Sequence, residues 1–115
     1  MEITEKQQLE EIGQAMHDYW FDVDAMVYSK EAKTVKICFY TDSKKREGLL
    51  LTVNNVLACL INDTEQIGMY DLNHFEYDEK HGELRFITCI PLGLTLRVSS
   101  LAITVDGSQC QQTDP

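Results

Sequence analysis

The chain has little proline and no long apolar run. Proline occurs only at positions 91 and 115 of its 115 residues, so no proline-rich linker divides it. Its longest apolar run, Val56–Ile61, is far shorter than the roughly 20 residues that a membrane-spanning helix needs. A chain of this length buries enough surface for one core. We therefore expect a single domain over residues 1–105, followed by a polar, flexible tail over residues 106–115.

Basic residues are also few. The chain has 10 Lys and Arg residues against 19 Asp and Glu residues, which gives a net charge of −9. Binding to nucleic acid or to an anionic membrane needs clustered Lys and Arg, so both classes of partner are excluded. An acidic surface keeps a protein soluble and also permits a basic protein partner or a cation. The acidic, polar start of the chain does not resemble a signal peptide, and we expect a cytoplasmic protein.

Catalytic motifs and paired cysteines are absent as well. The sequence has no GxSxG motif, no glycine-rich phosphate loop and no CxxC pair. We therefore expect no cofactor and no catalytic residues. The four cysteines are widely spaced, and in a cytoplasmic chain we expect free thiols. They are Cys38, Cys59, Cys89 and Cys110, of which Cys110 lies in the polar tail and is the predicted reactive thiol.

A helical pattern opens the chain. Thr4 and Gln7 have the spacing of a capping box, which marks the start of a helix. Gly13 lies on the apolar stripe and weakens a helix, so we expect it to let the helix approach a neighbour closely. The stripe at helical spacing consists of Leu9, Ile12, Met16 and Tyr19 or Trp20. This amphipathic helix is expected to cover one face of a sheet.

Strand-like alternation replaces the helical period after Trp20. The strongest hairpin signal joins His74–Tyr77 to Glu83–Ile90 across a DEKHG turn. The other expected strands are Val23–Val27, Thr34–Thr41, Leu49–Val53, Val56–Ile61 and Leu94–Val105, and Met69–Asn73 leads into the hairpin. The predicted fold is α+β, with an N-terminal helix packed on a curved, mostly antiparallel sheet of about six or seven strands.

The junction between helix and sheet gathers ionisable side chains. It contains His17, Asp18, Asp22 and Asp24 beside the only tryptophan. Carboxylates together with an imidazole can hold a divalent metal ion. In the other interpretation these acids are solvated or cap the local backbone. The sequence leaves both interpretations open.

An acidic, aromatic segment follows at residues 68–78. Tyrosine is favoured at recognition surfaces because it offers a large contact area with few rotamers. We predict a partner-binding face here, whereas the simpler interpretation is an edge hairpin protected by its charges. The residues predicted to bind are Tyr70, Asp71, His74, Glu76 and Tyr77.

Three short motifs support a resemblance. They are HDYWFDVD after the helix, then Leu51, Val53, Asn55 and Val56 in the pattern LxVxNV, then YDLN at residues 70–73. In these the chain resembles small uncharacterised bacterial α+β proteins, some of which are similar to the immunity proteins encoded beside secreted toxins. The resemblance implies a helix followed by an antiparallel sheet and carries no catalytic residues.

These observations favour a non-enzymatic, acidic protein-binding domain with an immunity-like role. Its expected partner is a basic protein such as a toxin nuclease, because complementary charge speeds association. The first alternative is a domain that binds a small ligand or a divalent metal, or a weak enzyme, with its site at the helix–strand junction. The second alternative is a homodimer in which a sheet face or edge pairs with its own copy.

Overall fold

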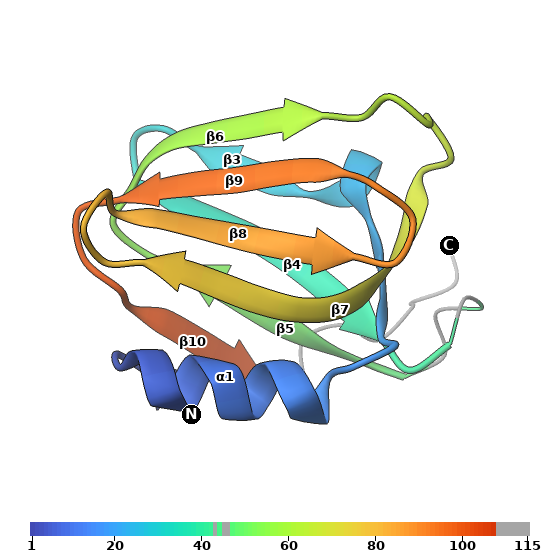
Figure 1. Ribbon diagram of the computed structural model, residues 1–115, viewed down its shortest axis with the longest axis horizontal. Helices are drawn as coiled ribbons and strands as arrows, with labels where there is room; N and C mark the ends of the chain where they lie inside the picture. Colours follow the sequence, from blue (N-terminus) through green and yellow to red (C-terminus); the bar gives the residue numbers. More distant parts are fainter. Residues whose placement is uncertain (43, 45–46, 108–115) are drawn as a thin grey trace.

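One short helix and ten strands make up the fold (Figure 1). The computed structural model describes residues 1–42, 44 and 47–107. The elements are β1 (Glu2–Ile3), α1 (Lys6–Ala15), β2 (Trp20–Asp22), the 3₁₀ turn η1 (Val23–Ala25), β3 (Val27–Ser29), β4 (Thr34–Tyr40), β5 (Gly48–Val53), β6 (Val56–Asn62), β7 (Met69–Asp78), β8 (Glu83–Thr88), β9 (Gly93–Val98) and β10 (Ile103–Asp106). Most of the predicted tail lies outside the described residues. No helix in the described part of the chain is long and apolar enough to cross a membrane.

All the strands belong to one antiparallel sheet. Its order is β1-β10-β5-β4-β2-β7-β8-β9-β6, and β3 pairs with β4 beside β2. The predicted helix on an antiparallel sheet is confirmed, but the prediction of six or seven strands is wrong. The strands β1, β2 and β3 have only two or three residues each, too few to show an alternating pattern. The expected strand Leu94–Val105 is two strands, because the chain bends after Val98.

The sheet folds over on itself to form two layers. Figure 1 shows β6, β9, β8 and β7 in front of β3, β4, β5 and β10, with α1 along the lower side. Strand β2 joins the layers, because it pairs with β4 on one side and with the start of β7 on the other. The interior between the layers is filled by apolar side chains, with Phe21, Phe39, Tyr70, Phe75 and Phe86 at its centre.

Helix α1 lies directly against strand β7. It begins one residue later than the predicted capping box implies, because Gln8 Oε1 accepts the N–H groups of Thr4 and Glu5 at 3.1 and 3.2 Å. The helix ends at Ala15, before Trp20. A Cβ atom on Gly13 would lie 3.2 Å from Cδ2 of Phe75, closer than ordinary contact. The predicted close approach at Gly13 is confirmed, and it fixes the position of α1 beside β7.

Candidate functional site

The turn after α1 brings Asp18 to the side of strand β7. The backbone of Asp18 is left-handed, with φ of 70°, and its N–H donates to the carbonyl of Leu72 at 2.8 Å. The Leu72 N–H donates in return to the carbonyl of Tyr19 at 2.7 Å. Aspartate tolerates a left-handed conformation better than most residues. The turn is therefore held firmly against the strand that carries Asp71.

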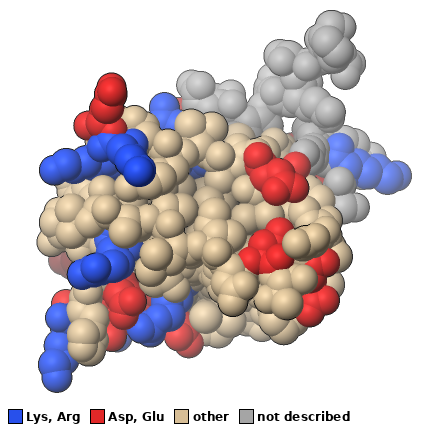
Figure 2. All heavy atoms as spheres, turned by 90° about the horizontal axis from the view of Figure 1, so that it is seen from above, with Lys and Arg blue, Asp and Glu red and all other residues tan. Residues whose placement is uncertain are grey.

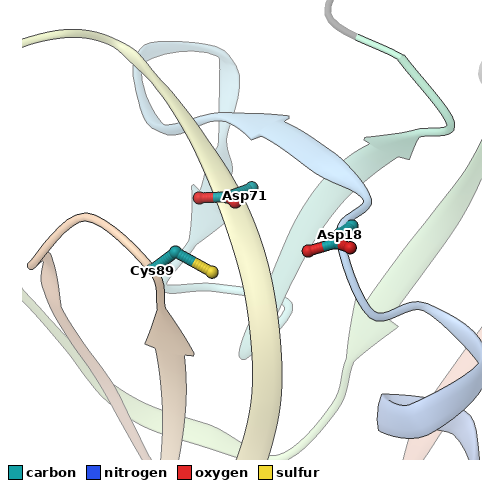
Figure 3. A group of neighbouring side chains, drawn as sticks. All are labelled: Asp18, Asp71 and Cys89. Atoms are coloured by element: carbon teal, nitrogen blue, oxygen red, sulfur yellow. The ribbon is translucent and has the colours of Figure 1, made fainter.

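Asp18, Asp71 and Cys89 converge from three separate segments (Figure 3). Asp71 lies on β7, and Cys89 follows the end of β8, where its N–H donates to the carbonyl of Asp71 at 3.3 Å. One potential ligand atom from each of the three side chains lies within 4.8 Å of the others. Asn73 completes this side of the cluster, with Nδ2 at 4.0 Å from the sulfur. The arrangement offers two carboxylates and one thiol to a shared point.

The electrostatics of this cluster suppress thiol reactivity. A hydrogen bond to Asp71, partial desolvation and the charges of Asp71 and Asp18 raise the pKa of the Cys89 thiol. Only the thiolate is an effective nucleophile, so Cys89 is protonated and weakly reactive near neutral pH. The Oδ1 atom of Asp71 is buried and has no hydrogen-bond partner among the described residues. A buried carboxylate oxygen without a partner is costly, and a bound cation would satisfy it.

The structure separates the acids of the predicted junction site into two places. Asp22 and Asp24 do not belong to the cluster around Asp18. Asp22 Oδ1 accepts the Asp24 N–H at 3.0 Å, which caps the turn η1, as the local-capping interpretation expects. A Cβ atom on Gly68 would lie 3.5 Å from Asp24 Oδ2, so this pair of acids faces the entry to β7.

His17 lies at the rim of the cluster. Its Nδ1 is 3.0 Å from the carbonyl oxygen of Asn73, and its Nε2 is 3.4 Å from Asp18 Oδ1. The ring is about half exposed and ties the turn to β7. His17 and Asp18 are thus close together as predicted, but Asp71 and Cys89 are their neighbours in place of Asp22 and Asp24.

A second group of possible ligands occupies the turn between β7 and β8. His81 Nδ1 is 2.7 Å from Asp78 Oδ2, and this hydrogen bond is the main reason that the pKa of Asp78 is lowered. Arg85 lies 3.0 Å from Glu83 Oε1 and 3.9 Å from Asp78 Oδ2. The positive charge of Arg85 balances these acids, so the group is explained by stabilisation of the turn.

A groove of about 690 Å³ lies between α1 and β7. Its acidic side chains outnumber its basic ones by four to two. Three of the residues predicted to bind a partner line it, namely His74, Glu76 and Tyr77. The other charged and polar lining residues are Lys6, Glu10, Gln14, Asp78, Glu79 and Arg85.

The prediction for Tyr70 is wrong. The side chain of Tyr70 is completely buried, and its hydroxyl donates to Asp63. The reason is a bulge in β7 between Leu72 and His74, which shifts the register against β8. Tyr70 and Leu72 point into the core before the bulge, and Phe75 does so after it. A strictly alternating interpretation of the segment misses this change of face.

The cysteine predictions have a mixed outcome. Cys59 and Cys89 are free thiols as expected, whereas Cys38 is disulfide-bonded, so the expectation of thiols throughout is wrong at that position. Cys110 lies outside the described residues.

Comparison with known proteins adds no assignment. No protein-family model matches the chain, and neither a curated protein nor a solved structure shows significant similarity to it.

Proposed function

We propose that this is a non-enzymatic binding protein that holds a basic segment of a protein partner in the groove between α1 and β7. The observation that carries the proposal is the groove itself, which has a volume of about 690 Å³ and is lined by Glu10, Glu76, Asp78 and Glu79. A volume of about 690 Å³ is in the range of ordinary binding pockets. An immunity-like role against a basic toxin is the particular form that the sequence resemblance favours.

The charges of the groove suit a basic ligand. Glu76 is half exposed, and its Oε1 is 3.3 Å from Nε2 of His74. Arg85 is already engaged by Glu83 at 3.0 Å, so it opposes a cationic ligand less than a free guanidinium would. Exposed carboxylates at a rim act mainly by raising the association rate. Tyr77 adds an amphipathic surface beside these acids.

Removing two of these charges is expected to weaken binding of a basic peptide. The probe is a fluorescein-labelled oligoarginine peptide, measured by fluorescence anisotropy at low and at high salt. We expect the double variant Glu76→Gln, Glu79→Gln to lose about five- to tenfold in affinity, because each exposed ion pair contributes up to about 1 kcal/mol. Affinity of the unchanged protein should fall with added salt.

A matched pair of substitutions separates the groove from the overall charge. Glu31 lies in the turn between β3 and β4 and Glu65 in the loop before β7, and both side chains are exposed. The variant Glu31→Gln, Glu65→Gln has the same net charge as the groove variant and should bind almost as the unchanged protein does. Equal losses of affinity in the two variants would show that peptide binding depends on net charge alone, which would refute the groove as the binding site.

Divalent metal binding at Asp18, Asp71 and Cys89 is the second candidate function. It is favoured by the buried, unpartnered Oδ1 of Asp71 and by the mixed carboxylate and thiol donors, a set that Zn²⁺ accepts. Zn²⁺ is then expected to raise the melting temperature and to protect Cys89 from iodoacetamide, as measured by mass spectrometry of the Cys89 peptide.

The variant Asp71→Asn tests the metal site through the same thiol. Without metal it should increase alkylation of Cys89 severalfold at mildly alkaline pH, since loss of the neighbouring charge lowers the thiol pKa. With Zn²⁺ it should show neither protection nor a higher melting temperature. Unchanged melting and alkylation of the wild-type protein on addition of Zn²⁺ would remove this candidate. Cys59, whose pKa is raised by burial, serves as an internal reference.

A further inference from the structure

Strand β6 leaves one edge of the sheet open. It pairs with β9 on one side, and no strand in the described part of the chain pairs with its other side. The sheet almost closes here, because the N–H of Val56 donates to the carbonyl of Lys33 in the β3–β4 turn at 2.8 Å. Beyond that bond, Figure 1 shows β6 in the front layer and β3 in the back layer, on the same upper side of the molecule.

This edge lacks the charges and proline that usually protect an edge strand, and the one register irregularity in its ladder with β9 lies at its start, between Val56 and Ala58. Strand β6 carries no charged residue and no proline, and the sequence is uncharged from residue 48 to residue 62. Leu57, Leu60 and Ile61 are 53%, 52% and 47% exposed. Edge strands of soluble proteins normally avoid pairing with other chains by carrying charges or proline. Figure 2, which views this side from above, shows charged side chains toward the two ends and a broad uncharged region between them.

The exposure of Ile61 shows that the core is uncovered at this edge. Ile61 is paired with Leu94, and Cys59 with Leu96, across the ladder between β6 and β9. Both leucines are buried, and directly opposed residues in an antiparallel pair share a face of the sheet. Ile61 therefore points toward the core side of the sheet and is still half exposed. An added strand beside β6 would cover it.

We propose that β6 pairs with β6 of a second copy of this chain, antiparallel and about a two-fold axis. A net charge of −9 makes two copies repel each other over most of their surface, so the uncharged region around β6 is where they approach at least cost. An apolar, uncharged edge is also complementary to itself. The two-fold pairing uses the same edge in both copies, so it closes both edges and ends growth at a dimer. It leaves the groove between α1 and β7 outside the interface.

Mass measurement tests the dimer. Sedimentation equilibrium of the full chain, over about a hundredfold range of concentration, should approach twice the chain mass of 13.2 kDa. In the dimer, the lysine of Leu60→Lys or Ile61→Lys would face either the same lysine of the second copy or apolar side chains of the interface. Each variant should therefore be a monomer. Because both side chains are exposed, neither change should unfold the monomer, which circular dichroism and a melting curve will verify. Ile90→Lys, at a 41% exposed position in the turn after β8, should remain dimeric.

Amide hydrogen exchange locates the interface independently. Successive amides of a strand point to opposite sides, so only part of the amides of Cys59, Leu60 and Ile61 face the open edge. Those that do should become protected from exchange as protein concentration rises, and they should stay unprotected in Leu60→Lys. A wild-type protein that is monomeric over the whole range overturns the proposal. So does a dimer that both lysine variants leave intact, since its interface would lie elsewhere. Open-ended growth into larger species contradicts the two-fold arrangement, and pairing only with a different protein in a mixed sample contradicts self-association.

Discussion

Replacing Phe86 with alanine is expected to lower the free energy of unfolding by about 3–5 kcal/mol. Phe86 is buried on β8, where its ring stacks on Phe39 with centroids 6.3 Å apart and planes inclined by 5°. It also meets Phe75 edge-on at 5.2 Å and Phe21 at 6.3 Å. Because Phe39 belongs to the back layer and Phe86 to the front layer, the ring joins the two halves of the folded sheet. Urea unfolding followed by tryptophan fluorescence measures the loss.

Phe86→Leu is the control for this prediction. Leucine keeps most of the apolar volume and loses the ring contacts, so we expect a smaller loss of about 1–2 kcal/mol. Small domains have a total stability of roughly 5–15 kcal/mol, so the alanine variant should be marginal at 37 °C and the leucine variant should not. A loss below about 1 kcal/mol for Phe86→Ala would mean that the layers are not joined at this ring.

The elements with long, regular patterns were predictable from sequence. Strand β4 shows alternation over seven residues, and the turn signal between β7 and β8 identified a hairpin that the structure confirms. Strands β1 to β3 were missed because pairing with distant neighbours defines them: β1 exists only because it pairs with β10. The order of the strands in the sheet could not be predicted from the sequence either. All the strands pair in the antiparallel direction and are similar in composition, so the sequence does not distinguish one possible partner from another.

The candidate sites, too, were only partly predictable from the sequence. The sequence placed Asp18 correctly among ionisable groups but joined it to its neighbours in the chain, whereas the fold joins it to Asp71 and Cys89. Contacts between residues far apart in the sequence bring these segments together, among them the hydrogen bonds between Asp18 and Leu72 and between Cys89 and Asp71. The bulge in β7 likewise decides that Tyr70 is buried while His74 lines the groove. A single sequence carries no local signal for either effect.

Replacing Gly13 with valine is expected to lower the free energy of unfolding by about 2–3 kcal/mol. A Cβ atom would lie 3.2 Å from Cδ2 and 3.4 Å from the backbone nitrogen of Phe75, and the two further methyl groups of valine would meet the backbone of β7. The ring of Phe75 can shift slightly, but the strand backbone cannot. Gly13→Ala should be nearly neutral, because the better helix propensity of alanine offsets the close approach of its Cβ atom to Phe75.

Gly13→Val is also expected to weaken binding, because the position of α1 against β7 determines the shape of the groove. If valine moves α1 away from β7, the two walls of the groove separate, and Gly13→Val should weaken oligoarginine binding without changing any charge. Ala15→Val, at an exposed position of the same helix, has the β-branched side chain without the contact and should leave both stability and affinity nearly unchanged. Equal stability of the two valine variants would mean that α1 is not seated against β7. A destabilised Gly13→Val with full affinity, measured where it is still folded, would instead mean that the peptide does not bind between them.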